Sequence, residues 1–205
     1  DSLTIGNSSN GNITVDNLYA ANSNNILTKL ELKSGGSISF LNNDSTFNAF
    51  ALNLKANSGI SFSKNVISSG TTTIDSDVDN DGIGNFTIAG SKKFNTDNNT
   101  LQITANDLDL SGKLNSGMAS TELLVSDDGT IGLGDTAGDL SITSAELQNI
   151  TATDLTVGNS NGNLTVDNIT AANSQNITGT VTLKATKDGS CITFTGKGST
   201  FNALS

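Results

Sequence analysis

Residues 101–117 read LQITANDLDLSGKLNSG, and this stretch contains the pattern that decides the fold. Leu101 and Ile103 flank a polar residue, and Leu108 and Leu110 do the same a few positions later. Residues two apart in a β-strand point to the same face, so each triplet predicts a short strand with one apolar face. Gly, Asn, Asp and Ser follow the triplets, and these residues favour turns.

The same triplet recurs along the whole chain, which predicts an all-β protein. Only residues 143–150 (TSAELQNI) suggest a helix, of one or two turns. Each strand offers about two inward apolar side chains, a core so thin that it closes best when strands stack as a parallel β-helix, or β-solenoid, of ~20–23 residues per rung. The other triplets include 3–5, 13–15, 30–32, 38–40, 60–62, 86–88, 123–125, 131–133, 140–142, 155–157, 164–166, 181–183 and 192–194.

A long internal repeat is the most specific feature of the sequence. With Ser9 left out, residues 3–33 and 155–184 are identical at 20 of 30 positions, and residues 35–49 match 189–203 at 8 of 15. The period is therefore about 152–154 residues. We expect one solenoid domain over residues 1–205, with one period in 1–152 and the start of the next in 153–205. A period of about seven rungs would rise roughly 33 Å, and we expect the chain to be a segment of a longer repetitive protein.

The composition excludes several classes of function. The chain has no His, Arg, Trp or Pro, and its net charge is −10. Without His there is no imidazole base or His-bound metal, and without clustered cations nucleic acid is an unsuitable partner. No apolar run reaches the ~18–20 residues that span a bilayer. Cys191 is the only cysteine, so an internal disulfide is excluded.

The style of the rungs resembles the repeat region of filamentous-haemagglutinin-type proteins, which are giant bacterial surface proteins. The resemblance implies a right-handed parallel β-helix that is exported to the cell surface and acts in adhesion, biofilm or fibre formation. The N-terminal secretion domain of that family is not recognisable here, which leaves the export route open. The resemblance is carried by GSISF (36–40), GISFS (59–63), TTTIDSDVDNDGIGNFTIAGS (71–91), LQITANDLDLSGKLNSG (101–117) and DGTIGLGDTAGDLSITSAELQNITATDLTVGN (128–159).

The densest acidic stretch, residues 75–85, is a candidate calcium site. Alternating Asp residues in a loop that contains glycine supply the oxygen ligands that Ca²⁺ prefers. The bidentate Glu that ends an EF-hand loop is missing, and a solvated turn is the alternative interpretation. The candidate ligands are the side chains of Asp75, Asp77, Asp79, Asp81 and Asn85 and the carbonyl of Ile83.

A second candidate site is an outward row of threonines at the centres of the triplets. If they stacked on one flat face, the solenoid would suit glycan or ice binding; alternatively, Thr simply fits strands well. The threonines are Thr4, Thr14, Thr87, Thr156, Thr165, Thr182 and Thr193.

Taken together, the residues and the resemblance predict a structural or adhesive module of an extracellular bacterial fibre rather than an enzyme. Parallel β-helices include polysaccharide-cleaving enzymes that need two carboxylates, but this chain lacks Arg, His and Trp to orient a sugar. We expect neighbouring repeats or copies of the chain as partners along the fibre axis, and a glycan or cell-surface receptor is a further possibility. Cys191 is predicted to face outward or into a turn.

Overall fold

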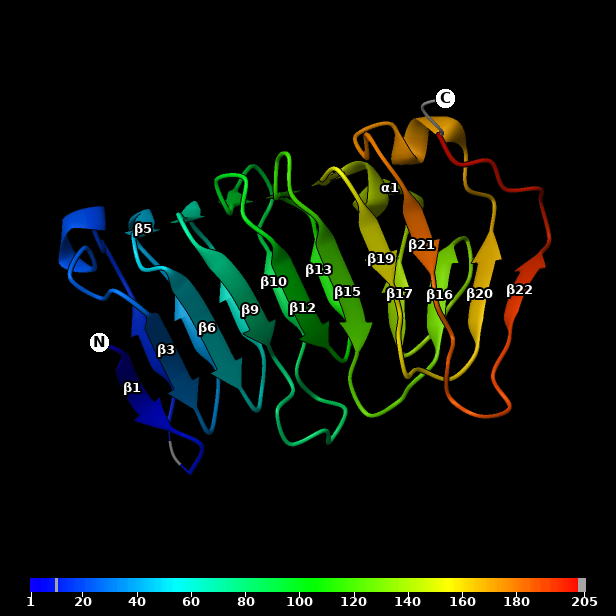
Figure 1. Ribbon diagram of the computed structural model, residues 1–205. Coiled ribbons are helices and arrows are strands. Elements are labelled where there is room, and N and C mark those ends of the chain that lie inside the picture. The colour runs from blue at the N-terminus through cyan, green and yellow to red at the C-terminus, as the bar shows by residue number, and fades with distance from the viewer. Residues whose placement is uncertain (10, 203–205) are drawn as a thin grey trace.

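The computed structural model describes residues 1–9 and 11–202, and its strands stack along one axis (Figure 1). Every strand pairing between described strands is parallel. The prediction of an all-β fold is confirmed, and the stacked parallel sheets are compatible with a β-solenoid. Helical segments are confined to α1 (Ser144–Gln148), η1 (Ala20–Asn22) and η2 (Ala171–Ser174) among the described residues.

The strands form four sheets, which we call A to D. Sheet A contains β1 (Leu3–Asn7), β3 (Lys29–Ser34), β6 (Ala51–Ala56), β9 (Thr71–Asp75), β12 (Leu101–Ala105), β15 (Thr121–Val125), β19 (Leu155–Val157) and β21 (Val181–Leu183). Sheet B contains β2 (Ile13–Val15), β4 (Ile38–Phe40), β7 (Ile60–Phe62), β10 (Phe86–Ile88) and β13 (Leu108–Leu110). Sheet C contains β5 (Ser45–Phe47), β8 (Val66–Ser68), β11 (Lys93–Asn95), β14 (Lys113–Asn115) and β18 (Ile150–Thr151). Sheet D contains β17 (Leu140–Ile142), β16 (Ile131–Gly134), β20 (Leu164–Asp167) and β22 (Ile192–Thr195).

Successive passes of the chain visit sheet A, then sheet B or D, and then sheet C or a 3-10 helix, and each pass forms one rung. Leu30 pairs with Leu52, and Leu52 pairs with Thr72, so the expected rung length is correct for both of these steps. The expectation is wrong for four other steps, which are longer, and the two longest run from Thr72 to Leu101 and from Thr121 to Leu155. The other two run from Leu3 to Leu30 and from Leu155 to Val181. Each of the two longest rungs contains an insertion directly after its sheet A strand, which is β9 in one and β15 in the other.

The core follows from the alternation read in the sequence. Strands such as β4, β7, β10 and β13 bury their first and third residues. Phe62 lies at the centre of an aromatic cluster, with ring centroids 4.6 Å from Phe40, 5.2 Å from Phe86 and 5.0 Å from Phe94, all edge to face. Edge-to-face pairs add about 0.5–1.5 kcal/mol each beyond the burial of apolar area. Identical positions on successive rungs thus build one continuous apolar core.

The wall formed by sheets B and D contains one strand more than sheet A over the same stretch. β15 pairs directly with β19 in sheet A, whereas β17 and β16 both lie between β13 and β20 in the other wall. Between β13 and β17 carboxylates replace the backbone ladder: Asp107 Oδ1 accepts the Ser141 N–H at 2.8 Å, and Glu146 Oε1 accepts the Leu110 N–H at 3.0 Å. From β1 to its repeat equivalent β19, sheet A has six steps, not the expected seven.

The predicted short helix is present as α1. Its N-cap Thr143 accepts the Glu146 N–H at 3.2 Å, and Glu146 Oε2 accepts the Thr143 N–H at 2.9 Å, which is a capping box. Among the described residues, α1 and the 3-10 helices are too short and too polar to cross a membrane.

Candidate functional site

The predicted calcium ligands lie in residues 76–85, which we call the acidic loop, and in the strand before it. The loop leaves sheet A after β9 and enters sheet B at β10. Carboxylate oxygens of Asp77, Asp79 and Asp81 all lie within 4.8 Å of one another. The structure therefore brings three of the five predicted side-chain ligands together.

Asp77 is fully buried and anchors the loop. Its Oδ1 accepts the Asp81 N–H at 3.3 Å, and its Oδ2 accepts the Gly82 N–H at 3.2 Å and the Ser126 hydroxyl at 2.6 Å. A carboxylate has about four lone-pair positions, so about one remains for a cation. Asp79 and Asp81 are exposed and provide the remaining carboxylates of the cluster.

The other two predicted ligands are used differently. Asp75 is half-buried at the end of β9, outside the three-carboxylate cluster, and its Oδ1 accepts the Asp77 N–H at 3.4 Å. Burial raises the pKa of Asp75, against the opposing effects of that N–H and of Lys55; the negative charge of Asp77 adds to the rise. The side-chain oxygen of Asn85 accepts the Asn106 amide at 3.3 Å, on the next rung.

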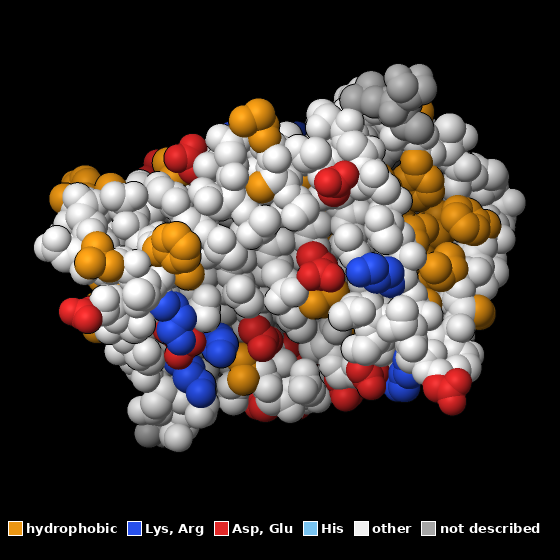
Figure 2. Space-filling view, viewed as in Figure 1, with side chains coloured by type: hydrophobic (Ala, Val, Ile, Leu, Met, Phe, Trp, Pro, Cys, Tyr) orange, Lys and Arg blue, Asp and Glu red, His pale blue; other side chains and the backbone are white. Residues whose placement is uncertain are grey.

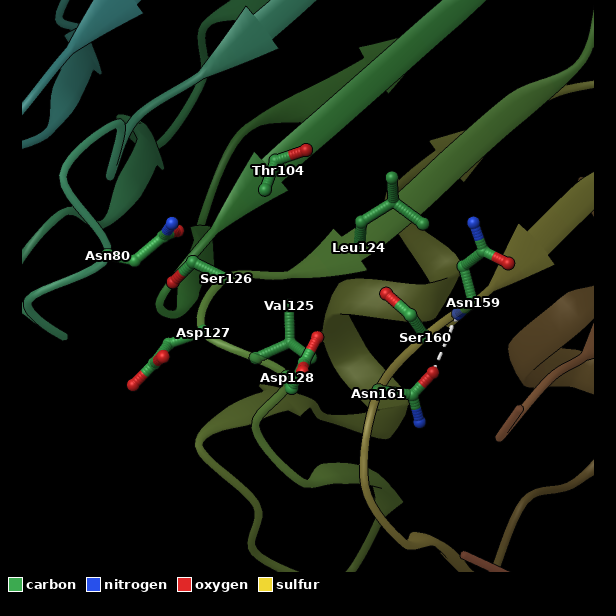
Figure 3. A pocket seen from close by; sticks show the side chains of 10 residues that line it. All are labelled: Asn80, Thr104, Leu124, Val125, Ser126, Asp127, Asp128, Asn159, Ser160 and Asn161. Carbon is green, nitrogen blue, oxygen red and sulfur yellow. Dashed lines mark hydrogen bonds between the residues drawn. The ribbon is translucent and has the colours of Figure 1, made fainter. Parts of the chain in front are cut away.

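Beside the acidic loop, the surface is hollowed by a polar cavity of about 330 Å³ (Figure 3). Asn80 of the loop lies on one side, and Asn159 and Asn161 lie across from it. Ser126 connects the two features, since it lines the cavity and also donates to buried Asp77. The cavity is lined by Asn80, Thr104, Leu124, Val125, Ser126, Asp127, Asp128, Asn159, Ser160 and Asn161.

Asp127 and Asp128 add carboxylates that the sequence did not single out. Both adopt a positive φ, at 52° and 50°, in the turn after β15. The sequence Asp-Asp-Gly indicated only a turn, because its distance from the acidic loop along the chain hides their closeness in space. Lys187 Nζ lies 3.7 Å from Asp128 Oδ2, an exposed pair worth at most about 1 kcal/mol. Carboxylates and amides at this corner favour a hard cation or a polar ligand.

The threonines of the second candidate site lie on more than one wall. Thr4, Thr156 and Thr182 belong to sheet A, where Thr4 pairs with Glu31 and Thr156 lies between Glu122 and Thr182. The remaining four, Thr14, Thr87, Thr165 and Thr193, belong to sheets B and D, where Thr87 lies between Ser61 and Asp109. The single threonine array that this alternative requires is therefore not formed. Only adjacent pairs remain, Thr156 with Thr182 and Thr165 with Thr193.

The surface is polar over much of the face in Figure 2. Lys29 and Lys55 lie 3.2 and 3.6 Å from Glu31 Oε2 on sheet A. Burial alone would raise the pKa of Glu31, but the Lys29 hydrogen bond and the charges of Lys55 and Lys29 outweigh it and lower the pKa. Cys191 is exposed, as predicted, with its Sγ 3.5 Å from Asn163 Oδ1.

Comparison of the chain with family models, curated proteins and solved structures found no match. The resemblance to filamentous-haemagglutinin-type repeats therefore stays a prediction, and function must be inferred from the fold and its surfaces.

Proposed function

We propose that this chain is a structural and adhesive module of a long extracellular fibre on a bacterial surface. In this proposal the chain forms a stiff right-handed β-helix shaft, and its role is mechanical rather than catalytic. Neighbouring repeats or copies of the chain are its partners along the fibre axis. A glycan or a cell-surface receptor is the partner that the fibre binds.

The observation that carries the proposal is the uninterrupted ladder of sheet A. Eight parallel strands from β1 to β21 pair in sequence, so backbone hydrogen bonds run along the axis throughout. A single apolar core follows the same axis, from Val15 on the first rung to Ile177 near the other end. Pulling the rungs apart requires breaking several bonds at once, which suits a load along the shaft.

The charge of the chain supports a role in an extended, soluble rod. A net charge of −10 with only ten lysines makes parallel rods repel one another. Divalent cations at carboxylate clusters such as Asp77, Asp79 and Asp81 would reduce that repulsion. Lateral contacts in the fibre are therefore expected to depend on ionic conditions.

Electron microscopy and fibre diffraction of the native material from its source cells test the proposal. We expect thin continuous filaments with an axial spacing near 4.8 Å and a longer repeat of roughly 29–34 Å, for six or seven levels per period. Short particles of fixed length would overturn the fibre proposal.

A further inference from the structure

The edge formed by β1, β2 and η1 presents apolar side chains without a partner rung. Among residues 1–9 and 11–202, no strand pairs with the side of β1 that faces away from β3. Leu3 and Ile5 are 43% and 46% exposed. Beside them a cavity of about 230 Å³ opens onto the core, lined by residues that include Ile5, Ile13, Leu18 and Phe47.

The repeat supplies a second copy of this edge within the same molecule. The repeat equivalents of β1, β2 and η1 are β19, β20 and η2. Both copies bind the following rung in the same way. Asn12 Oδ1 accepts the Ser37 N–H at 2.9 Å, and its equivalent Asn163 accepts the Cys191 N–H at 3.1 Å.

A second pair of contacts extends the match. Asp16 Oδ1 accepts the Asn43 N–H at 3.0 Å, and its equivalent Asp167 accepts the Lys197 N–H at 2.8 Å. The two copies therefore have equivalent local structure on the side that faces the next rung. They differ on the other side, which is open in the first copy.

In the second copy, residues 121–152 cover that other side. Leu123 pairs with Val157 across β15 and β19, and Leu133 pairs with Val166 across β16 and β20. Leu155 and Val157, the equivalents of Leu3 and Ile5, are 0% exposed.

The 3-10 helix region is covered as well. The side-chain amides of Asn173 and Asn176 donate to the carbonyls of Ser144 and Gln148, at 3.3 and 2.9 Å. Ala152 forms an isolated parallel bridge with Ile177. All three faces of the second copy thus contact one continuous segment.

We propose that the β1–β2–η1 edge is a docking surface for a further period of this repeat, which presents an edge like that of residues 121–152. The register follows from the second copy: the equivalent of Leu123 lies opposite Ile5, that of Leu133 opposite Val15, and that of Ala152 opposite Ile26. This inference rests on the proposed structural function and specifies the partner edge.

The chain's own last rung is a poorer partner for this edge. β21 and β22 are the repeat equivalents of β3 and β4, whose following neighbours are β6 and β7. Stacking a second copy end to end would therefore juxtapose edges that do not meet within the molecule. It would also place β22, rather than an equivalent of β16, against β2.

A tandem chain tests the inference: residues 1–153 followed directly by residues 2–205, so that Ser2 takes the place of its equivalent Asp154. In a C191S background, Ile5→Cys in the second period makes one thiol at the junction. We compare the rate at which this thiol reacts with a small disulfide reagent with the rates of the Ile5→Cys and Val157→Cys thiols in the single chain. We expect the junction thiol to react at least about tenfold more slowly than Ile5→Cys in the single chain, and to approach Val157→Cys.

Met118→Cys in the second period is the control, since Met118 is 81% exposed and its rate should not change. An unprotected junction thiol overturns the inference, and so does a tandem chain that fails to fold, because its junction repeats a boundary that the single chain folds. Protection of Ile5→Cys in the single chain at high protein concentration also overturns it, in favour of a second copy stacked end to end. If the junction thiol is protected but the native material consists of short particles, only the fibre proposal is refuted. If the thiol is unprotected but the native material forms long filaments, only the docking inference is refuted.

Discussion

Two insertions leave sheet A at the same corner and end in different places. The acidic loop, residues 76–85, remains outside the stack, and β9 and β10 pair with the rungs on both sides as though it were absent. The second insertion, residues 126–139, contributes β16 to the wall, where it pairs with β17 and β20. The first lengthens a rung, and the second adds a strand.

Side-chain chemistry explains the difference. The acidic loop carries Asp79 and Asp81, whose charges stay hydrated, and its Ile83 is 66% exposed. Residues 131–134 read IGLG, and all four are buried. Gly132 allows the connection to β17 to lie directly against the β16 backbone, because a Cβ there would clash with the carbonyl group of Thr136. Apolar alternation with small residues therefore turns an insertion into a strand.

The largest expected effect comes from emptying the core beneath the second insertion. Leu133 is fully buried, so Leu133→Ala should lower the free energy of unfolding by about 2–5 kcal/mol. The matched control is Ile83→Ala in the acidic loop, which should stay within about 0.5 kcal/mol. Urea unfolding followed by circular dichroism measures both, and equal losses would contradict the contrast between the insertions.

Crowding the glycine contact should have the next largest effect. Gly132→Ala should cost about 1–3 kcal/mol, because the connection must move away from β16. Gly90→Ala is the control: no heavy atom lies within 4 Å of its Cβ position, so a small gain of up to about 1 kcal/mol is expected. Hydrogen exchange should locate the loss in residues 131–142, and protection unchanged there would refute the role of Gly132.

Calcium should stabilise the first insertion if its carboxylates form a site. At tenfold excess over the dissociation constant, Ca²⁺ would add about 1.4 kcal/mol to the free energy of unfolding. The double variant Asp79→Asn/Asp81→Asn should abolish this gain and barely alter stability in chelator, since both residues are exposed. A melting temperature that is the same in Ca²⁺ and in chelator would identify the loop as a solvated turn.

The smallest effect is a pH dependence of opposite sign at the two insertions. The raised pKa of Asp75 means that its protonated form stabilises the fold below the unfolded pKa, and this contribution is lost as pH rises through the folded pKa. The pKa of Asp139 is lowered by the N–H and hydroxyl of Thr130, both at 2.8 Å, so its contribution is present above the unfolded pKa and lost as pH falls through the folded pKa. Asp75→Asn should remove the decrease in the free energy of unfolding that the ionisation of Asp75 causes as pH rises towards neutral. Asp139→Asn should lower the free energy of unfolding most at neutral pH. Unfolding curves across acid and neutral pH measure both, and shifts of the same sign would refute the assignment.

Local patterns predicted much of the fold. Triplets such as Leu108–Leu110 and Ile60–Phe62 are strands, and the helix expected in 143–150 is α1. The triplets 131–133 and 140–142 are also strands, but the sequence did not indicate that they pair with each other across a short connection. That pairing depends on glycine contacts between backbones, which leave no period in the sequence.

The candidate site shows the same division. The acidic run predicted that Asp77, Asp79 and Asp81 would come together, because neighbours in a tight loop converge without help from the rest of the chain. Asp127 and Asp128 were missed because they are brought beside Asn80 only when successive rungs stack. The threonine array failed because a triplet specifies which residue faces outward but not which sheet its strand joins.

The sequence alone determined the all-β character and the equivalence of β1 and β19, since strand alternation and a long repeat are written in residue order. Only the tertiary structure decided the length of each rung, the additional strand β16, and the meeting of the two insertions at Ser126 and Asp77. The physical reason is the range of the interactions. Alternation is a pattern between residues two apart in the chain. Stacking depends on pairing between residues that lie a whole rung apart, such as Leu101 with Thr121 and Thr121 with Leu155.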